Sequence, residues 1–359
     1  MKRVLAAIGL VVSCVVAAQA SESQSKPVAI LGLSQLAPRG SSLEVTQSVA
    51  FISDTSIAVG LCQRGPGMNC SLFLIRCDGD ILKPYATTSH YRAGMSIHAF
   101  STGQILAKPM GTYPVVLFSA DLSEEQYLPS LYLASRSGNT VAEQKGTAWK
   151  IYRLLPRLAF VREGRGELQA ISDTLVAFRV GDVMNTETAE GTLLGSFSVR
   201  PKNKCYSTVQ LASNDRLYWE DCKGSRMVDF TGKKKVQLHP PKGWGSHWDT
   251  QQFWSADGKR VLFDHFDRKI SVARNTGEIL GAVMTLGMGV GDEQDNREEV
   301  QVLDTITGAS CFDWKRQFPE GSEAFPTNAA ISPSGELVAI VAGGAVSIYR
   351  LPTVCGPNK

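Results

Sequence analysis

Five tryptophan and histidine side chains lie close together in the sequence, between residues 239 and 254. Such side chains can stack on a sugar ring, a peptide or a flat cofactor. A simpler interpretation buries Trp254 in a strand and uses the others to fill the space between neighbouring sheets. The candidate ligand-binding patch consists of His239, Trp244, His247 and Trp248.

An acidic run, GDEQDNREE, covers residues 291–299. Its five carboxylates and one asparagine supply enough oxygen atoms to bind Ca²⁺. The spacing differs from that of the EF-hand loop, so a solvated loop is the alternative interpretation. The candidate metal ligands are Asp292, Asp295 and Glu298, and no other cofactor is indicated.

The five histidines do not form a familiar catalytic arrangement. The chain has no HExxH zinc motif, no histidine pair at metal-ligand spacing and no GxSxG serine elbow. A triad assembled in space is the only hydrolytic alternative. We therefore name no catalytic residue and expect a protein without enzymatic activity.

Residues 1–20 have the features of an export signal. Two basic residues precede an apolar run over residues 4–16, and the small-x-small sequence AQA ends at Ala20. We expect cleavage there and a mature chain from Ser21. Lipid attachment at Cys14 is the alternative, less favoured because the residues after Cys14 stay apolar.

Charge and hydropathy exclude two classes of partner. The chain has 37 basic and 34 acidic residues, and loss of the signal removes two basic ones. A balanced charge gives no global field to hold nucleic acid or an anionic membrane. No other stretch reaches the ~20 apolar residues of a transmembrane helix. We expect a periplasmic or extracellular protein.

An exported chain favours disulfides between its cysteines. Cys205 and Cys222 bracket two strand-like runs, so a hairpin would place them opposite each other at bonding distance. The same argument joins Cys62 and Cys70 around a Gly-Pro-Gly turn, and the shared position near the C-terminus suggests that Cys311 pairs with Cys355. Cys77 is then left over, either free and buried or in place of one of these partners.

The elements that position these residues come from an internal repeat. Residues 133–154 and 330–351 match at a constant offset of 197, with eleven identical residues in 22 positions. The unit is an apolar strand, a serine-centred turn and a second apolar strand. Looser copies bring the number of such turns to seven, centred on Ser53, Ser101, Ser135, Ser172, Ser213, Ser255 and Ser332.

Most of these turns are followed by a second turn that contains glycine, which predicts two hairpins per repeat. A four-stranded antiparallel sheet cannot bury both faces alone, but a closed ring of such sheets can. We therefore predict an all-β propeller domain over residues 21–359 with seven blades, or alternatively eight. The uncertainty comes from residues 268–298, which are either an insertion or a degenerate blade. Residues 26–34 form an apolar strand expected to pair with the last blade and close the ring.

Three hairpin sequences resemble a known group. WSADGKRVLF, SPSGELVAI and DTITGASCFDW are similar to turns of secreted bacterial WD40-like and YVTN-type propellers, a class that also includes quinoproteins. The resemblance spans roughly residues 45–352 and rests on turn chemistry, so it implies a fold and not a function.

Two functions follow from this organisation. The first is a non-catalytic scaffold that binds an envelope protein, a peptide or a polysaccharide through the irregular loops that include the aromatic patch. The second is a propeller enzyme, for instance a quinoprotein-like dehydrogenase or a lyase, with polar groups converging on the central channel. Cofactor absorbance or substrate turnover would distinguish the enzyme from the scaffold.

Overall fold

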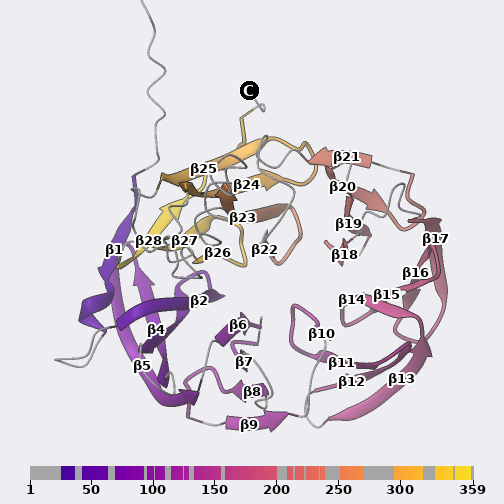
Figure 1. The fold of residues 1–359 in the computed structure, drawn as a ribbon, viewed down its shortest axis with the longest axis horizontal. Helices are drawn as coiled ribbons and strands as arrows, with labels where there is room; N and C mark the ends of the chain where they lie inside the picture. The colour runs from indigo at the N-terminus through magenta and orange to yellow at the C-terminus, as the bar shows by residue number, and fades with distance from the viewer. Residues whose placement is uncertain are drawn as a thin grey trace, which may run out of the picture.

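A computed structural model describes residues 26–36, 43–63, 69–92, 95–100, 102–109, 115–123, 125–128, 133–154, 158–199, 208–212, 215–221, 224–233, 235–238, 251–269, 295–317, 328–342 and 344–356. Seven four-stranded antiparallel sheets stand as blades around a central channel (Figure 1). The chain is therefore a seven-bladed β-propeller, as the repeat predicts. No helix in the described part of the chain is long and apolar enough to cross a membrane.

The first four blades follow one another along the chain. Their strands are, for blade 1, β2 (Leu43–Ser53), β3 (Ser56–Gln63), β4 (Asn69–Asp78) and β5 (Ile81–Arg92); for blade 2, β6 (Met95–Ala99), β7 (Ile105–Pro109), β8 (Val115–Phe118) and β9 (Glu125–Leu128); for blade 3, β10 (Leu133–Ala134), β11 (Thr140–Lys145), β12 (Ala148–Arg153) and β13 (Ala159–Arg165); and for blade 4, β14 (Glu167–Ile171), β15 (Leu175–Val180), β16 (Val183–Thr188) and β17 (Leu193–Ser198).

The last three blades include the closure of the ring. Their strands are, for blade 5, β18 (Thr208–Leu211), β19 (Arg216–Asp221), β20 (Gly224–Asp229) and β21 (Lys235–Leu238); for blade 6, β22 (Gln251–Trp254), β23 (Arg260–Lys269), β24 (Asp295–Asp304) and β25 (Ser310–Gln317); and for blade 7, β26 (Asn328–Ile331), β27 (Leu337–Ala342), β28 (Ala345–Arg350) and the N-terminal β1 (Ala29–Gly32). A 3-10 turn, η1 (Leu33–Gln35), follows β1.

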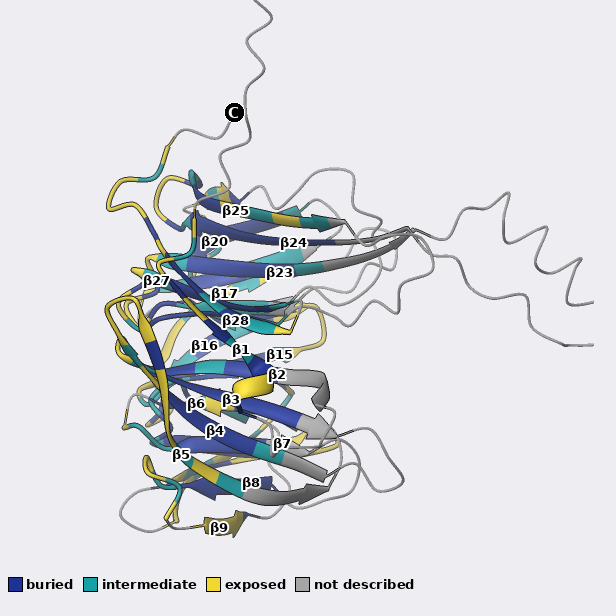
Figure 2. Cartoon of the chain, turned by 90° about the vertical axis from the view of Figure 1, so that its left-hand side faces the viewer, coloured by how far each residue is buried: buried dark blue, intermediate teal, exposed yellow. Residues whose placement is uncertain are grey.

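The core lies between the blades. Seven clusters of buried apolar side chains occur in the described residues, one at each blade-to-blade interface. Inner strands such as β27 are buried on both faces because a blade packs on each side, whereas the outer strand β17 is mostly exposed. Seen edge-on, a strand inside a blade such as β24 is dark blue where it is described (Figure 2). Burial on both faces of a sheet explains the continuous apolar runs that mark these strands in the sequence.

The repeated serines close the turns between the first two strands of the blades. The Oγ atoms of Ser135, Ser255 and Ser332 accept hydrogen bonds from backbone N–H groups five residues later at 3.0–3.1 Å. All three side chains are buried. A short side chain that satisfies a buried N–H is what this position requires, so serine recurs.

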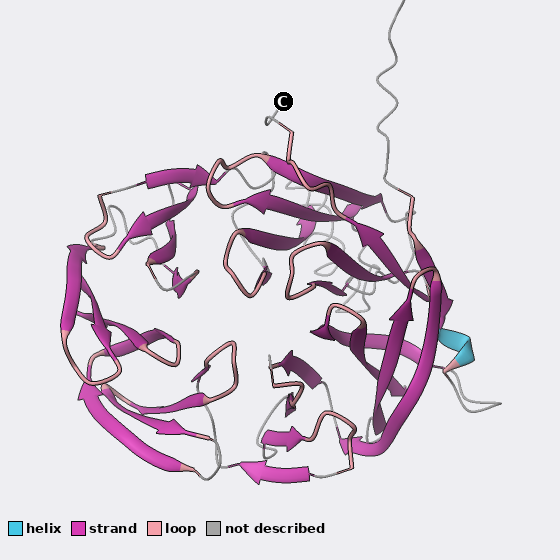
Figure 3. Ribbon diagram, turned by 180° about the vertical axis from the view of Figure 1, so that it is seen from behind, coloured by secondary structure: helices cyan, strands magenta, loops and turns pink. Residues whose placement is uncertain are grey.

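The strand β1 closes the ring. It pairs antiparallel with β28, from Ala29 opposite Ile348 to Gly32 opposite Ala345, and becomes the outermost strand of blade 7. Viewed from behind, the ribbon forms an unbroken circle of sheets (Figure 3). Ladder hydrogen bonds between the two ends of the domain thus replace a covalent closure.

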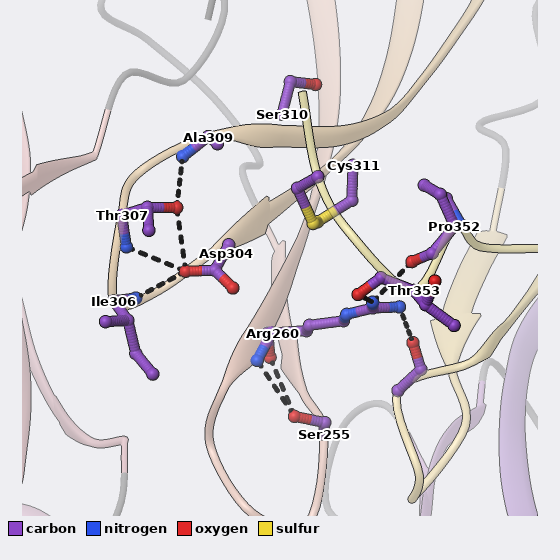
Figure 4. Close-up of a disulfide and its surroundings, with 12 residues drawn as sticks. Ser255, Arg260, Asp304, Ile306, Thr307, Ala309, Ser310, Cys311, Pro352 and Thr353 are labelled. Atoms are coloured by element: carbon purple, nitrogen blue, oxygen red, sulfur yellow. Dashed lines mark hydrogen bonds between the residues drawn. A yellow bond between two sulfur atoms is a disulfide. The ribbon is translucent and has the colours of Figure 1, made fainter. Parts of the chain in front are cut away.

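A disulfide and an arginine reinforce the joint between blades 6 and 7. Cys311 in β25 is bonded to Cys355 in the tail after β28, with 4.4 Å between their Cα atoms. Arg260 at the start of β23 donates hydrogen bonds to the carbonyl oxygens of Gly335 and Pro352, both at 2.6 Å (Figure 4). The C-terminal tail is therefore fixed to the neighbouring blade.

The serine turns at Ser255 and Ser332 are farther apart in the sequence than the other turns, and the structure of blade 6 explains this interval. β23 and β24 pair directly, from Arg260 opposite Asp304 to Lys269 opposite Asp295, so both belong to one sheet. Residues 270–294 join them and lie outside the described residues. This connectivity gives seven blades and favours an insertion over a separate blade.

The structure does not describe the side chains of the other two predicted disulfides. Cys62 and Cys70 are direct cross-strand partners in β3 and β4, but their side chains lie outside the described residues, so this bridge stays a prediction. Cys205 and Cys222 also lie outside the described part. Cys77 is a free, half-buried thiol, and burial raises its pKa to about 11.

Candidate functional site in the channel

The turns of blades 3 to 6 surround a pocket at one mouth of the channel, which we call the vestibule. Its volume is about 550 Å³. Hydroxyl and carboxylate groups dominate its polar lining, and one guanidinium lies among them. The polar side chains that line it are Ser135, Arg136, Ser137, Ser172, Asp173, Thr174, Asp215 and Asp257.

Asp173 joins blades 3 and 4 on one wall of the vestibule. It lies in the β14–β15 turn and accepts hydrogen bonds from the hydroxyls of Ser135 at 2.8 Å and Ser137 at 2.6 Å. Asn139 Nδ2 and Thr140 Oγ1 donate to it at 3.2 Å. Partial burial raises the pKa of Asp173, but these hydrogen bonds outweigh burial and hold it below the ordinary value. Asp173 is therefore an ionised structural anchor.

We expect Asp173→Ala to lower the free energy of unfolding by about 2–3 kcal/mol, because four donors lose a charged acceptor. Urea denaturation of the purified variant measures this loss. Asp54 is a matched control, since it occupies the corresponding turn of blade 1 and accepts one bond, from the Ser334 N–H at 2.9 Å. Equal losses in Asp173→Ala and Asp54→Ala would contradict the anchoring role.

Two further carboxylates stand closer to solvent. Asp257 accepts from Ser255 Oγ at 2.8 Å and from the Lys259 N–H at 2.9 Å, and its side chain is 46% exposed. Burial raises the pKa of Asp257, yet the hydrogen bonds from Lys259 and Ser255 hold it below the ordinary value. The Asp215 side chain is 79% exposed, 3.7 Å from Arg216 Nε. Both carboxylates are accessible to a cationic ligand.

A second pocket of about 250 Å³, which we call the inner chamber, adjoins the vestibule. Arg136 lines both pockets. Strand segments from blades 1, 2, 6 and 7 form the walls, with His98, Gln252 and Trp254 among the lining side chains. Burial among the surrounding strands and the positive charge of Arg136 lower the pKa of His98 to about 4. One side of the imidazole is exposed to the channel. The imidazole is therefore neutral at pH 7.

Hydrogen bonds hold the Trp254 side of the inner chamber rigid. The indole N–H of Trp254 donates to Gln210 Oε1 at 3.0 Å, and Gln210 Nε2 donates to Gln252 Oε1 at 2.8 Å. Gln252 Nε2 donates in turn to Glu220 Oε2 at 3.2 Å, which also accepts from the Tyr218 hydroxyl at 2.8 Å. The chain of bonds links blades 5 and 6 and fixes the channel wall.

The sequence-predicted aromatic patch is not part of this site. His239, Trp244, His247 and Trp248 lie outside the described residues. Trp254, which the packing interpretation placed in a strand, ends β22 and lines the channel, so it is only partly buried. The patch therefore stays a prediction.

The predicted metal ligands are placed only in part. Asp292 lies outside the described residues, and Asp295 begins β24 without a described side chain. Glu298 is buried in β24, with 1% of its surface exposed. No group of three metal-ligating side chains occurs in the described ranges.

Glu298 has a buried neighbour, Asp264 in β23. Burial away from solvent and the negative charge of Glu298 raise the pKa of Asp264 well above its ordinary value. A hydrogen bond from the Ala329 backbone lowers this pKa, but by less. The folded state therefore binds a proton that the unfolded state releases near pH 4. Stability falls as pH rises from the unfolded pKa to the folded pKa.

We expect Asp264→Asn to raise the free energy of unfolding by about 2 kcal/mol at neutral pH, because the amide keeps an acceptor for the Ala329 N–H and, unlike the carboxyl group, needs no proton to be taken up when the chain folds. Urea denaturation at about pH 5 and about pH 8 should show the larger gain at the higher pH. Asp80→Asn, at an exposed turn position, should change little at either pH. A loss of stability at the higher pH would contradict the raised pKa.

Sequence reasoning missed the residues that fill the channel. Arg136 and Asp173 lie inside the serine turns, which the sequence marked only as the repeated unit of the fold. A signal was present, because Arg136 aligns with Pro333 in the two longest repeats and so departs from the repeat inside a turn. A charged residue that breaks a structural repeat is a candidate for a role that the repeat does not explain.

Comparisons with known proteins find remote structural neighbours and no related sequence. No family model and no curated sequence matches the chain. Among solved structures, a chain of the mitotic checkpoint complex aligns with 12% identity and a TM-score of 0.48, covering 98% of this chain and 99% of that one. An oligogalacturonate lyase in complex with manganese aligns with 12% identity and a TM-score of 0.48, covering 92% and 95%. The WD40 domain of SCAP from fission yeast gives 9% identity, a TM-score of 0.35 and coverage of 89% and 97%.

The chain's own seven four-stranded sheets, rather than these remote neighbours, define its class as a β-propeller. At such identities a shared fold says nothing about a shared ligand or reaction. The function has to be argued from the channel itself.

Proposed function

We propose that the chain is an exported, non-catalytic propeller that binds a lysine- and arginine-rich segment of a peptide or envelope protein at the vestibule. The observation that carries this proposal is the lining of the vestibule, which sets three carboxylates against one guanidinium. Asp215 lies 3.7 Å from Arg216 Nε and Asp257 lies 3.0 Å from Lys259 Nζ, but the two carboxylates are 79% and 46% exposed. A ligand cation can therefore reach both of them from solvent.

The chemistry of the lining supports binding over turnover. Asp173 and Asp257 have lowered pKa values and accept several internal hydrogen bonds. A general base works best with a pKa near the operating pH, which these carboxylates do not have. Ion pairing with a fixed, ionised carboxylate needs no such tuning.

Export is supported by the sequence of residues 1–20 and is compatible with the Cys311–Cys355 disulfide, because disulfides persist in oxidising compartments. We place the mature protein in the periplasm or outside the cell. A partner there would be a protein or peptide that presents basic side chains to the acidic mouth of the channel.

The test is a titration of the purified, disulfide-intact protein with short capped peptides that alternate alanine with lysine or with glutamate. We expect saturable binding of the lysine peptide, weakened about tenfold in the double variant Asp215→Asn, Asp257→Asn, because each exposed ion pair contributes up to about 1 kcal/mol. Isothermal titration calorimetry at low salt measures both affinities.

A control variant removes a carboxylate elsewhere. Glu163→Gln lies on the exposed outer strand β13 and should leave the affinity unchanged. Binding that survives in the double variant but is lost in Trp248→Ala would move the site to the aromatic patch. Preference for the glutamate peptide or for a neutral oligosaccharide would refute the proposed ligand class.

A further inference from the structure

Arg136 crosses the channel between the vestibule and the inner chamber. It starts in the β10–β11 turn of blade 3, and its Nη atoms donate to the carbonyl oxygens of Leu211 at 2.5 Å and Ala212 at 2.8 Å in blade 5. A longer bond of 3.4 Å reaches the Ser255 carbonyl in blade 6. The guanidinium is thus held in one position by three backbone groups.

The charge of Arg136 has no ion-pair partner in the described part of the chain, where no carboxylate oxygen lies within 4 Å of it. The Trp254 ring, 5.2 Å from the guanidinium carbon, offers a weaker electrostatic contact. Burial lowers the pKa of Arg136 to about 10, and the more distant Asp257 opposes this, so the group remains a cation at neutral pH. An unneutralised cation inside a protein is costly and attracts an anion.

The guanidinium also has hydrogen-bonding capacity to spare. A guanidinium carries five N–H groups in a planar fork. The two N–H groups of Nη1 donate to Ala212 and Ser255, and one N–H group of Nη2 donates to Leu211. Among the described residues, no acceptor is assigned to Nε–H or to the second N–H of Nη2. Two N–H groups of one guanidinium are what a carboxylate needs for bidentate binding.

We propose that the inner chamber binds a small monocarboxylate, whose two oxygens accept from the remaining N–H groups of Arg136 and whose apolar body lies in the chamber beside Trp254. The lining favours an apolar body, since it includes Ile97, Phe253 and Ile331. A volume of about 250 Å³ limits the ligand to roughly the size of benzoate. This site goes beyond the proposed peptide function and uses none of its carboxylates, so either can fail alone.

The test compares benzoate with benzamide, which has the same ring and no charge. Calorimetric titration at constant ionic strength should give one saturable site for benzoate and affinity at least about tenfold lower for benzamide. Arg136→Gln should lose benzoate binding. Arg162→Gln is the matched control, because Arg162 also lies over a tryptophan ring, at 5.0 Å from Trp149, but is paired with Glu187.

Two further measurements keep the proposal testable if Arg136→Gln does not fold. Arg136→Lys keeps the charge but not the planar fork, and should weaken benzoate binding about tenfold. In the unmutated protein labelled with ¹⁵N-arginine, the Arg136 Nε–H resonance should shift on addition of benzoate and not of benzamide. Equal affinities for the two compounds, or an unmoved Nε–H resonance at saturation, would overturn the proposal.

Discussion

Replacing both Cys311 and Cys355 by serine should lower the free energy of unfolding by about 4 kcal/mol. The two residues are 44 positions apart, and cross-linking a loop of that length removes about this much free energy from the unfolded ensemble. The bond also holds the tail after β28 against β25, next to the Arg260 hydrogen bonds to the same tail (Figure 4). Its loss therefore weakens the joint beside the closing strand.

Urea denaturation of the oxidised protein and of the double serine variant measures this difference. The variant is preferable to a reducing agent, which would also act on any bridge at Cys62 and Cys70. Cys77→Ser controls for the loss of a thiol, since Cys77 is free and should cost about 1 kcal/mol. A loss below about 1 kcal/mol in the double variant would show that the ring closes without help from the disulfide.

Gly138→Ala is expected to cost about 3 kcal/mol or more, through the packing of blade 3 on blade 2. A Cβ atom at Gly138 would lie 2.2 Å from Cγ of Phe100, which is 1% exposed and belongs to the interface core. The backbone at Gly138 has a φ of +79°, so an alanine there is also strained. Neither the ring nor the turn can move without opening the interface.

The control for backbone strain is Gly146→Ala. Gly146 has a φ of +60° and no atom within 4 Å of an added Cβ, so it should cost only about 1–2 kcal/mol. Chemical denaturation of both variants separates the steric effect from the conformational one. Combining Gly138→Ala with Phe100→Leu should cost less than the sum of the single changes. Equal losses at the two glycines would contradict the close approach to Phe100.

The architecture was predictable because it is repeated. In blades 3, 6 and 7 a buried serine accepts a backbone N–H in the first turn, and a serine turn recurs at the same place in the other blades, so the sequence reveals the unit. Even the closing strand could be anticipated, since residues 26–34 are apolar and precede the first blade, and β1 indeed pairs with β28. The blade count stayed open because the β23–β24 hairpin breaks the spacing.

The channel could not be predicted in the same way. The partners of Arg136 are backbone carbonyls of Leu211 and Ala212, 75 and 76 residues away, and carbonyls leave no mark in a sequence. Asp173 looks like an ordinary turn residue until the ring brings blades 3 and 4 together. The aromatic patch was conspicuous in the sequence, but His239, Trp244, His247 and Trp248 lie outside the described residues and remain a prediction.

Zero-length cross-linking tests the proposed site most directly. Carbodiimide joins a lysine amine to a carboxylate only where the two are in contact, and mass spectrometry of the digested product locates the bond. With the lysine–alanine peptide, we expect cross-links at Asp215 or Asp257 in the vestibule. Cross-links confined to other carboxylates, such as Glu163 on the outer strand β13 or the acidic run 292–299, would contradict it.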